Sequence, residues 1–310
     1  MHGIKSWKNH KGNLLDSKDG FDVIECESCG FKHIVPVPAP EELEQIYKHE
    51  YYTKEKPHYI ERYTEDFEWW NMVYSERYDV FESLLSNERR RILDVGSGPG
   101  YFLAHGKNRG WSCIGLEPSI CASKHSNELG LDIISEFLSE GMQERLGLFD
   151  VIHMSEVLEH APDPVNLANI AKEMLNPGGL LCVVVPNDYN PFQHALRTAC
   201  GYNSWWVAPP HHINYFDPKS LTSLIASKGF DIILQESTFP IDMFLLMGDN
   251  YVGNDDLGRL CHAKRKSFEF NMTRAGMSGL KHALFREFFQ LGIGREILII
   301  GRKRENGNEF

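Results

Sequence analysis

The sequence predicts an α/β protein built around a mostly parallel sheet, and three features carry this prediction. From Arg91 onward, short apolar runs alternate with helix-like stretches, as a parallel sheet and its crossover helices require. The first apolar run, at 91–95, is followed at once by Gly96, Gly98 and Gly100 and then by a helix-like stretch. Apolar residues make up 42% of the 310 residues, so the chain can bury a large core.

The expected elements follow this alternation in chain order. The last crossover helix has clear ends, because Asp217 suits an N-cap, Pro218 suits the first helical position and Gly229 suits the end. We expect strands at 91–95, 112–117, 131–135, 149–154, 179–185 and 230–236. We expect helices at 99–110, 119–129, 163–175 and 217–228, and one at 72–87 before the first strand.

Three further segments surround the expected sheet domain, which spans 91–236 and 291–304. Residues 1–40 look like a small, loop-rich module. Residues 41–90 form an aromatic-rich helical lead-in, in which Tyr51 and Tyr52 are candidates to cover a bound cofactor. Residues 237–290 carry Met and Phe at helical spacing, and we expect a helical insertion over the mouth of the site or at a dimer contact. The chain is therefore expected to be a monomer or a homodimer.

Composition narrows the class of protein. A net charge of −11 argues against broad binding to nucleic acid. The sequence holds no apolar run of about 18 residues, so we expect no membrane span. The first residues lack the apolar core of a signal peptide, and only one close cysteine pair occurs among seven cysteines. These features favour a reducing cytoplasm.

Acidic residues stand at the ends of the first two expected strands. Asp94 lies two residues before Gly96, and Glu117 lies 17 residues after Gly100. A carboxylate at the first position would repel a pyrophosphate but would hold a cation, whereas the second falls where a ribose diol would lie. Two acidic strand ends around a glycine turn thus fit an adenosine that carries a cationic amino-acid tail.

On the pattern Asp94-x-Gly96-x-Gly98-x-Gly100 the sequence resembles the class I S-adenosylmethionine-dependent methyltransferases. The resemblance covers 91–236 and resumes at 294–303, which is similar to their final strand. It implies a Rossmann-like, doubly wound, mostly parallel seven-stranded sheet whose last strand is antiparallel, and S-adenosylmethionine as the cofactor. The residues expected to bind this cofactor are Asp94, Gly96, Gly98, Gly100, Glu117, Pro118, Phe137, Leu138 and Ser155.

The segment expected to contact the adenine of the cofactor departs from the family's pattern. Many relatives place an acidic residue after the third strand, whereas this chain reads Ile-Ile-Ser-Glu-Phe-Leu at 133–138. Either Glu136 or the backbone at Phe137 and Leu138 would contact the adenine.

A second group of polar residues follows the fourth expected strand. Glu156, Glu159 and His160 lie past its carboxyl end, where open α/β sheets bind ligands, and the run resembles that of many small-molecule methyltransferases. His211 and His212 follow the fifth strand. Because methyl transfer to oxygen or nitrogen needs a base, the candidates are His160, His211 and His212, with Glu159 as an orienting residue or alternative base. Asn187 or Tyr189 is placed by position alone to line the acceptor site.

A metal-assisted mechanism is the competing interpretation of the same residues. Glu156, Glu159, His160 and His212 could surround a divalent ion that lowers the pKa of an acceptor hydroxyl. This arrangement resembles the metal site of small-RNA 2′-O-methyltransferases, and ubiquinone-pathway O-methyltransferases carry a related Glu-x-x-Glu-His run. The acidic net charge argues against an RNA substrate.

The N-terminal module contains a second candidate metal site. Cys26 and Cys29, followed by Gly30, form a Cys-x-x-Cys-Gly knuckle of the shape that wraps zinc. Two further ligands are needed, and the available histidines are His2, His10 and His33. The module resembles half of the zinc ribbon that precedes some bacterial methyltransferase domains, often acting on sugars. Zn²⁺, a vestigial or dimer-completed knuckle and a redox pair all remain open, and a hydroxyl of a sugar, nucleotide-sugar or polar metabolite is the expected acceptor.

Two other functions compete with methyl transfer. A nicotinamide-dependent dehydrogenase needs Gly-x-Gly-x-x-Gly, but Gly100 comes one residue early and Asp94 would face a phosphate. A non-enzymatic module would keep the fold and use the knuckle or the insertion to bind partners.

Overall fold

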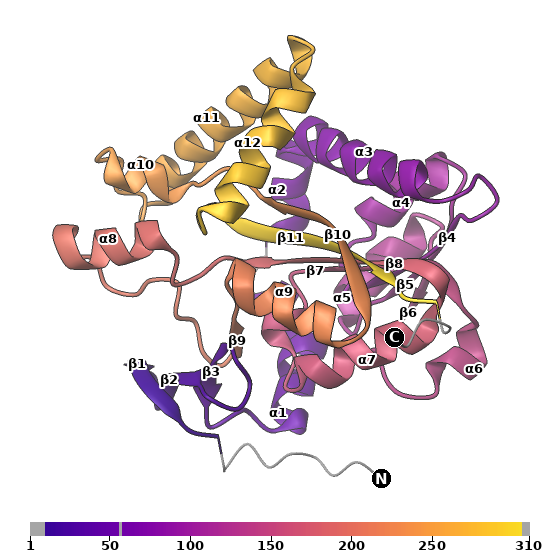
Figure 1. Ribbon diagram of the computed structural model, residues 1–310, viewed down its shortest axis with the longest axis horizontal. Helices are drawn as coiled ribbons and strands as arrows, with labels where there is room; N and C mark the ends of the chain where they lie inside the picture. Colours follow the sequence, from indigo (N-terminus) through magenta and orange to yellow (C-terminus); the bar gives the residue numbers. More distant parts are fainter. Residues whose placement is uncertain (1–9, 56–57, 306–310) are drawn as a thin grey trace.

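The computed structural model describes residues 10–55 and 58–305. A seven-stranded sheet lies at its centre, with helices on both faces (Figure 1). The last strand is antiparallel to both of its neighbours, whereas the pairs from β8 to β6 are parallel, which confirms the predicted fold class. The strands, in their spatial order, are β10 (Phe230–Ser237), β11 (Glu296–Lys303), β8 (Leu175–Pro186), β7 (Phe149–Ser155), β4 (Arg91–Val95), β5 (Ser112–Leu116) and β6 (Asp132–Ile134).

Alternation along the central strands builds two cores. Successive side chains of a strand point to opposite faces, so Ile92 and Leu93 of β4 are both fully buried but belong to different cores. One core packs against α7 (Pro164–Met174) and α9 (Pro218–Ser227), and the other against α3 (Phe67–Leu84) and α4 (Tyr101–Asn108). The smaller helical elements around the sheet are α5 (Ile120–Glu128), α6 (Met142–Leu146) and η3 (Leu158–His160).

The N-terminal module is a small sheet rather than the loop-rich piece that the sequence suggested. Strands β1 (Gly12–Lys18), β2 (Phe21–Cys26) and β3 (Lys32–Val35) pair antiparallel, and β3 then pairs with β9 (Asn214–Tyr215) of the main domain. The expectation was wrong because these strands are short and partly exposed, which weakens their apolar pattern. The module is thus joined to the main domain by strand pairing.

The lead-in consists of α1 (Pro40–Gln45), the π-helical η2 (Ile46–Glu55), α2 (Tyr59–Glu65) and α3. The helix predicted at 72–87 is the later part of α3, which begins five residues earlier, at Phe67. His2 and the side chain of Tyr52, both named in the sequence predictions, lie outside the described residues.

The insertion is helical, as predicted, but it does not cover the mouth of the site, whereas the alternative of a dimer contact stays a prediction. It contains α10 (Asp242–Leu246), α11 (Asp255–Arg274) and α12 (Ser278–Gln290), and α8 (Pro191–Cys200) precedes it in the chain. Lys281 Nζ lies 2.6 Å from Glu76 Oε1 of α3, and Trp69 Nε1 donates to Glu269 Oε2 at 2.9 Å. The insertion therefore packs against α3, in the upper part of Figure 1. None of its described residues lines the cavity at the carboxyl ends of β4, β5 and β7.

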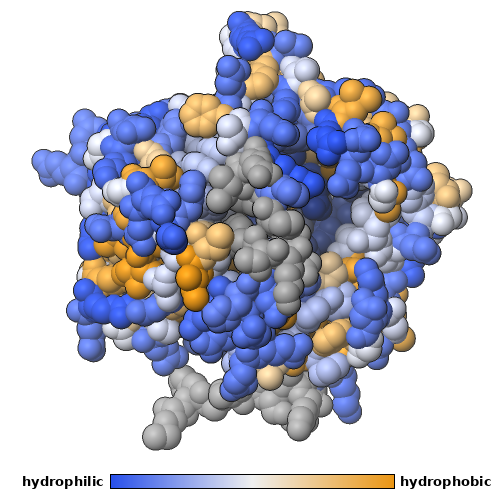
Figure 2. Space-filling model, turned by 180° about the vertical axis from the view of Figure 1, so that it is seen from behind, coloured by the Kyte–Doolittle hydropathy of each residue, from blue (hydrophilic) through white to orange (hydrophobic). Residues whose placement is uncertain are grey.

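The surface seen from behind is mostly hydrophilic, with hydrophobic residues in separate patches (Figure 2). Among the described residues, no helix is both long and apolar enough to cross a bilayer.

Candidate functional site

A cavity of about 590 Å³ opens at the carboxyl ends of β4, β5 and β7. This is the edge at which open α/β sheets bind ligands, and the volume is that of an ordinary small-molecule pocket. Its walls come from three places: the strand ends, the glycine turn and the aromatic lead-in. Of the nine residues predicted to bind the cofactor, eight line it: Asp94, Gly96, Gly98, Glu117, Pro118, Phe137, Leu138 and Ser155.

The glycine turn has the conformation that its composition predicts. Gly96, Gly98 and Gly100 have φ values of 69°, 53° and 81°, in the left-handed region that favours glycine. A Cβ on Gly96 would lie 2.8 Å from Val157 Cγ2, so the turn passes too close to its neighbours for a side chain. Gly100 differs from the prediction because it does not line the cavity. It is the N-cap of α4 and packs against Leu131 and Ser126.

The Glu117 carboxylate is fixed at the cavity wall. Its Oε2 accepts a hydrogen bond from Gly98 N at 2.7 Å, and its Oε1 accepts one from Ser119 N at 2.8 Å. Burial raises the pKa of Glu117 to about 7, although the two backbone N–H groups oppose the shift. The end of β5 is thereby tied to the glycine turn, and the carboxylate oxygens can accept from a diol.

Asp94 belongs to a buried chain of polar groups that the sequence did not reveal. His153 Nδ1 lies 2.7 Å from Asp94 Oδ1, and Arg77 Nη1 lies 3.1 Å from His153 Nε2. Burial lowers the pKa of His153, so the imidazole is neutral. It therefore donates from Nδ1 to Asp94 and accepts at Nε2 from the Arg77 guanidinium. The His153 ring also stacks on Phe102, with centroids 4.0 Å apart.

The far end of the cavity contains both sets of residues expected to contact the adenine, and that contact stays a prediction. Phe137 and Leu138 line the cavity together with Pro118. Glu136 also lines it, but the Glu136 carboxylate is exposed and forms a bidentate pair with Arg145 at 3.1 and 2.7 Å. That pair leaves Phe137, Leu138 and Pro118 as an apolar wall suited to a flat ring.

Of the three histidines proposed as the base, His160 is the one that lines the cavity. Its Nδ1 donates to the backbone carbonyl of His211 at 2.7 Å, which leaves Nε2 as the acceptor nitrogen. Glu159 Oε1 lies 3.7 Å from that Nε2. Glu156 also lines the cavity and has a φ of 58°, a conformation that non-glycine residues rarely adopt outside functional sites.

His211 and His212 support His160 from outside the cavity lining. The His211 carbonyl accepts from both His160 and the Tyr47 hydroxyl, the latter at 3.2 Å. The ring of His212 lies 5.1 Å from the His160 ring, and its Nδ1 is 3.9 Å from Asp188 Oδ2. Burial raises the pKa of Asp188 to about 6.

The candidate metal ligands are brought together only in part. Glu159, His160 and His212 each offer a ligand atom within 4.8 Å of the others, and Glu156 is outside this group. Three ligands with an open position is the arrangement of a catalytic metal site. The group therefore fits a divalent ion, with three of the four predicted ligands.

The two residues suggested for the acceptor site by position have other roles. Asn187 Nδ2 donates to the carbonyls of Gly292 and Gly294 at 3.0 and 3.2 Å. The Tyr189 hydroxyl donates to Asp16 Oδ2 at 2.8 Å and so ties the main domain to the N-terminal module. Neither residue lines the cavity, and Asp188 between them is the one that approaches His212.

Aromatic side chains of the lead-in cover the cavity beside His160. Tyr47 and Tyr51 line it, with ring centroids 5.5 and 6.4 Å from that of His160. Burial raises the pKa of Tyr47, so its phenol remains protonated and donates to the His211 carbonyl. That Tyr51 covers the cofactor stays a prediction, since its ring lies beside His160. Trp70 and Tyr74 extend the same wall.

The chain is similar to known proteins over the greater part of its sheet domain. Residues 73–235, just over half of the chain, match a family model described as "Methyltransferase domain". The chain is 28% identical to a ubiquinone biosynthesis O-methyltransferase of Caulobacter sp. over 47% of this chain and 61% of that protein. It is 32% identical to the enzyme of that name from Escherichia coli O139:H28 over 29% and 40% of the two chains. The matches thus span less than two thirds of these relatives.

The chain also aligns with solved structures. A S-adenosylmethionine-dependent methyltransferase from Archaeoglobus fulgidus aligns with 75% of this chain and 94% of its own, at 16% identity and a TM-score of 0.47.

Proposed function

Because the chain belongs to the S-adenosylmethionine-dependent methyltransferases, we propose that it methylates a hydroxyl of a small polar molecule, with His160 as the base. The observation that carries the proposal is the orientation of His160. Its Nδ1 proton is committed to the His211 carbonyl, and its ring lines the cavity beside Glu156. An imidazole whose tautomer is fixed by the Nδ1 hydrogen bond has Nε2 as its basic nitrogen, and such a group is suited to take a proton from a hydroxyl.

The cofactor supplies a methyl group on a sulfonium, which is already activated toward a nucleophile. In this proposal Asp94 attracts the cationic methionine end, while His153 and Arg77 hold Asp94 in place. Glu117 accepts hydrogen bonds from the ribose hydroxyls, and Pro118, Phe137 and Leu138 receive the adenine. Two buried carboxylates beside a glycine-rich turn support this assignment, since they match a ligand with a cation at one end and a diol beside it.

The residues of this chain then bind and orient the acceptor. Tyr47 and Tyr51 form an aromatic wall next to His160, which suits a flat or ring-shaped molecule with a hydroxyl directed at the imidazole. Holding this hydroxyl in line with the methyl group supplies much of the rate enhancement, and proton removal by His160 adds to it. A sugar, a nucleotide-sugar or a polar metabolite with a ring would fit. The O-methyltransferase names of the relatives support oxygen as the acceptor atom.

A screen with isotopically labelled cofactor tests the proposal. Purified protein is incubated with a panel of sugars, nucleotide-sugars and hydroxylated aromatic metabolites, and mass spectrometry locates the methyl group on each product. We expect an O-methylated product whose formation is lost in His160→Ala and retained in His194→Ala, since His194 is exposed on α8. Methylation of carbon or nitrogen, or full activity of His160→Ala, would contradict it.

Metal-assisted transfer is the second candidate, because Glu159, His160 and His212 form a three-ligand group. A divalent ion there would polarise the acceptor hydroxyl, and His160 would then serve as a ligand. Activity that falls on chelation and returns with added Mg²⁺, Mn²⁺ or Zn²⁺, and that is lost in His212→Ala, would favour this candidate. Unchanged turnover after chelation would favour His160 as the base.

A further inference from the structure

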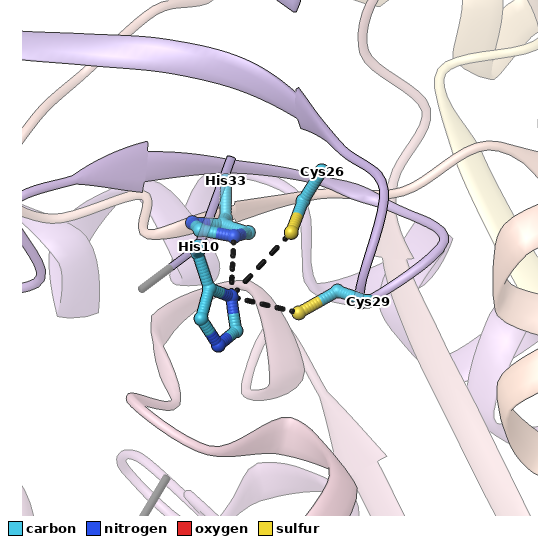
Figure 3. Close-up of side chains that lie close together, drawn as sticks. All are labelled: His10, Cys26, Cys29 and His33. Atoms are coloured by element: carbon cyan, nitrogen blue, oxygen red, sulfur yellow. Dashed lines mark hydrogen bonds between the residues drawn. The ribbon is translucent and has the colours of Figure 1, made fainter. Parts of the chain in front are cut away.

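We propose that His10, Cys26, Cys29 and His33 bind one Zn²⁺ in a closed structural site (Figure 3). The Nδ1 atom of His10 lies 3.2 Å from His33 Nε2, 3.4 Å from Cys26 Sγ and 3.3 Å from Cys29 Sγ. All four ligand atoms lie within 4.8 Å of one another. The sequence supplied the two cysteines and left the rest of the set open. The structure brings both histidines to them from the same chain, so no partner subunit is needed to complete the set.

The spacing is that of a tetrahedral site. Zinc bonds of about 2.0–2.1 Å to nitrogen and about 2.3 Å to sulfur place neighbouring ligand atoms roughly 3.3–3.8 Å apart. The three separations from His10 Nδ1 are close to this range. Two thiolates and two neutral imidazoles would also balance the charge of the ion, and four protein ligands leave no open position. The site would therefore be structural rather than catalytic.

The local backbone holds the cysteines in a knuckle. Cys26 ends β2 and Cys29 lies in the turn before β3, where Gly30 has a φ of 74°. Gly30 N donates to the Cys26 carbonyl at 3.0 Å, and Cys26 N donates to the Phe31 carbonyl at 3.2 Å. Glu27 N donates to the Lys11 carbonyl at 3.1 Å, so the segment that carries His10 is tied to the same turn.

His33 is oriented as a metal ligand would be. Its Nδ1 hydrogen-bonds the Ile34 carbonyl at 2.9 Å, so Nε2 carries the lone pair and points at the other three ligands. Metal-binding histidines usually donate their second nitrogen in this way.

The site is continuous with the acceptor side of the cavity. His33 is paired in register with Asn214 of β9, and Asn214 Nδ2 donates to the carbonyls of Leu158 and Ala161 at 2.9 and 2.7 Å. Ile213 N donates to the Glu159 carbonyl at 2.8 Å. Strand β3 thus braces both η3, which carries His160, and the segment that carries His211 and His212. We infer that Zn²⁺ stabilises the strand that positions these histidines, a consequence that rests on the proposed function, whereas metal binding itself does not.

Metal content tests the site without any assay of activity. The full chain is purified from zinc-replete cells and analysed by mass spectrometry for metals, together with Cys26→Ser, His10→Ala, His212→Ala and Cys200→Ser. Cys200 is an exposed cysteine of α8 and serves as the matched control. We expect about one Zn²⁺ per chain in the wild type, in Cys200→Ser and in His212→Ala, and a loss of most of it in the other two.

Cobalt substitution provides a second readout that does not depend on the folding of the ligand variants. Zinc is removed from the wild type by chelation and replaced by Co²⁺. The visible absorption of Co²⁺ distinguishes tetrahedral coordination by thiolates from a site that has only oxygen and nitrogen ligands. We expect the thiolate signature in the wild type and in Cys200→Ser, and an apparent melting temperature that falls on chelation in both. Zinc-free wild-type protein, a disulfide between Cys26 and Cys29, or zinc lost only in His212→Ala would overturn the proposal.

Discussion

The Nδ1 atom of His153 lies 2.7 Å from Oδ1 of Asp94, and both side chains are almost fully buried. The two residues are paired directly across β7 and β4, so the contact is set by strand register. A neutral His153 donates to the carboxylate on one side and accepts from Arg77 on the other. Asp94 is thereby held in one orientation at the wall of the cofactor cavity before any ligand binds.

We expect His153→Phe to weaken binding of S-adenosylhomocysteine about tenfold. The phenyl ring keeps the stacking with Phe102 but leaves the Asp94 carboxylate without its buried donor, a loss worth roughly 1–3 kcal/mol. Calorimetric titration measures the effect, with His194→Ala as the surface control. Wild-type affinity in His153→Phe would show that Asp94 needs no such support.

The raised pKa of Glu117 predicts how the stability of the chain changes with pH. Burial raises the pKa of Glu117 to about 7 in the folded chain, against an ordinary value of 4.5. A carboxyl whose pKa is raised by folding contributes stability that is full below the unfolded value and is lost as pH rises through the folded value. Between about pH 4.5 and 7 this residue should therefore reduce the free energy of unfolding, by an amount on the order of 3 kcal/mol.

Glu117→Gln should flatten this part of the pH profile, because glutamine does not titrate. Urea unfolding of the wild type and the variant at pH 5 and pH 8 measures the difference. Other buried acids, such as Asp188, titrate in the same window, so the comparison between the two proteins isolates Glu117. An identical decline in both proteins would contradict the assignment.

Replacement of the proposed base should lower turnover without loss of the cofactor. We expect His160→Gln to reduce kcat by roughly 10²- to 10⁴-fold, the usual contribution of a general base, while S-adenosylhomocysteine affinity stays within about twofold. His211→Ala is the matched control, because the backbone carbonyl of His211, and not its ring, orients His160. Equal loss of kcat in both variants would argue against a direct role for the His160 ring.

The aromatic wall of Tyr47 and Tyr51 should contribute more to binding of the acceptor than to binding of the cofactor. We expect Tyr51→Ala to raise the KM for the acceptor about tenfold, since a stacked aromatic contact is worth about 0.5–1.5 kcal/mol beyond the buried area. Tyr51→Phe keeps the ring and should remain close to the wild type. Steady-state kinetics with each substrate varied in turn separates the two effects, and a rise confined to the KM for S-adenosylmethionine would place Tyr51 at the cofactor instead.

Local pattern was sufficient to predict the main sheet and the acidic strand ends that line the cavity. The apolar run of β4, the three glycines after it and the acidic strand ends lie within one stretch of chain, so Asp94 and Glu117 could be placed from spacing alone. The observed ends of the strands differ from the predicted ends by only a few residues. The exception is β8, which begins at Leu175, four residues before the predicted start.

The sequence alone did not predict the contacts between distant segments. The pairing of His153 with Asp94 depends on strand register, and the pairing of β3 with β9 joins residues about 180 positions apart. The place of the insertion is set by buried pairs such as Lys281 with Glu76, which no local pattern reveals. The same holds for the zinc ligands, since His10 reaches the knuckle only because β1 and β2 form a hairpin.

Calorimetric titration of S-adenosylhomocysteine into the wild type, Asp94→Ala, Glu117→Ala and Asp231→Ala tests the central claim most directly. Asp231 is an exposed acid on β10 and controls for the loss of one negative charge. We expect each of the two cavity variants to bind at least about tenfold more weakly, and Asp231→Ala to bind as the wild type does. Wild-type affinity in both Asp94→Ala and Glu117→Ala would show that the cofactor binds elsewhere.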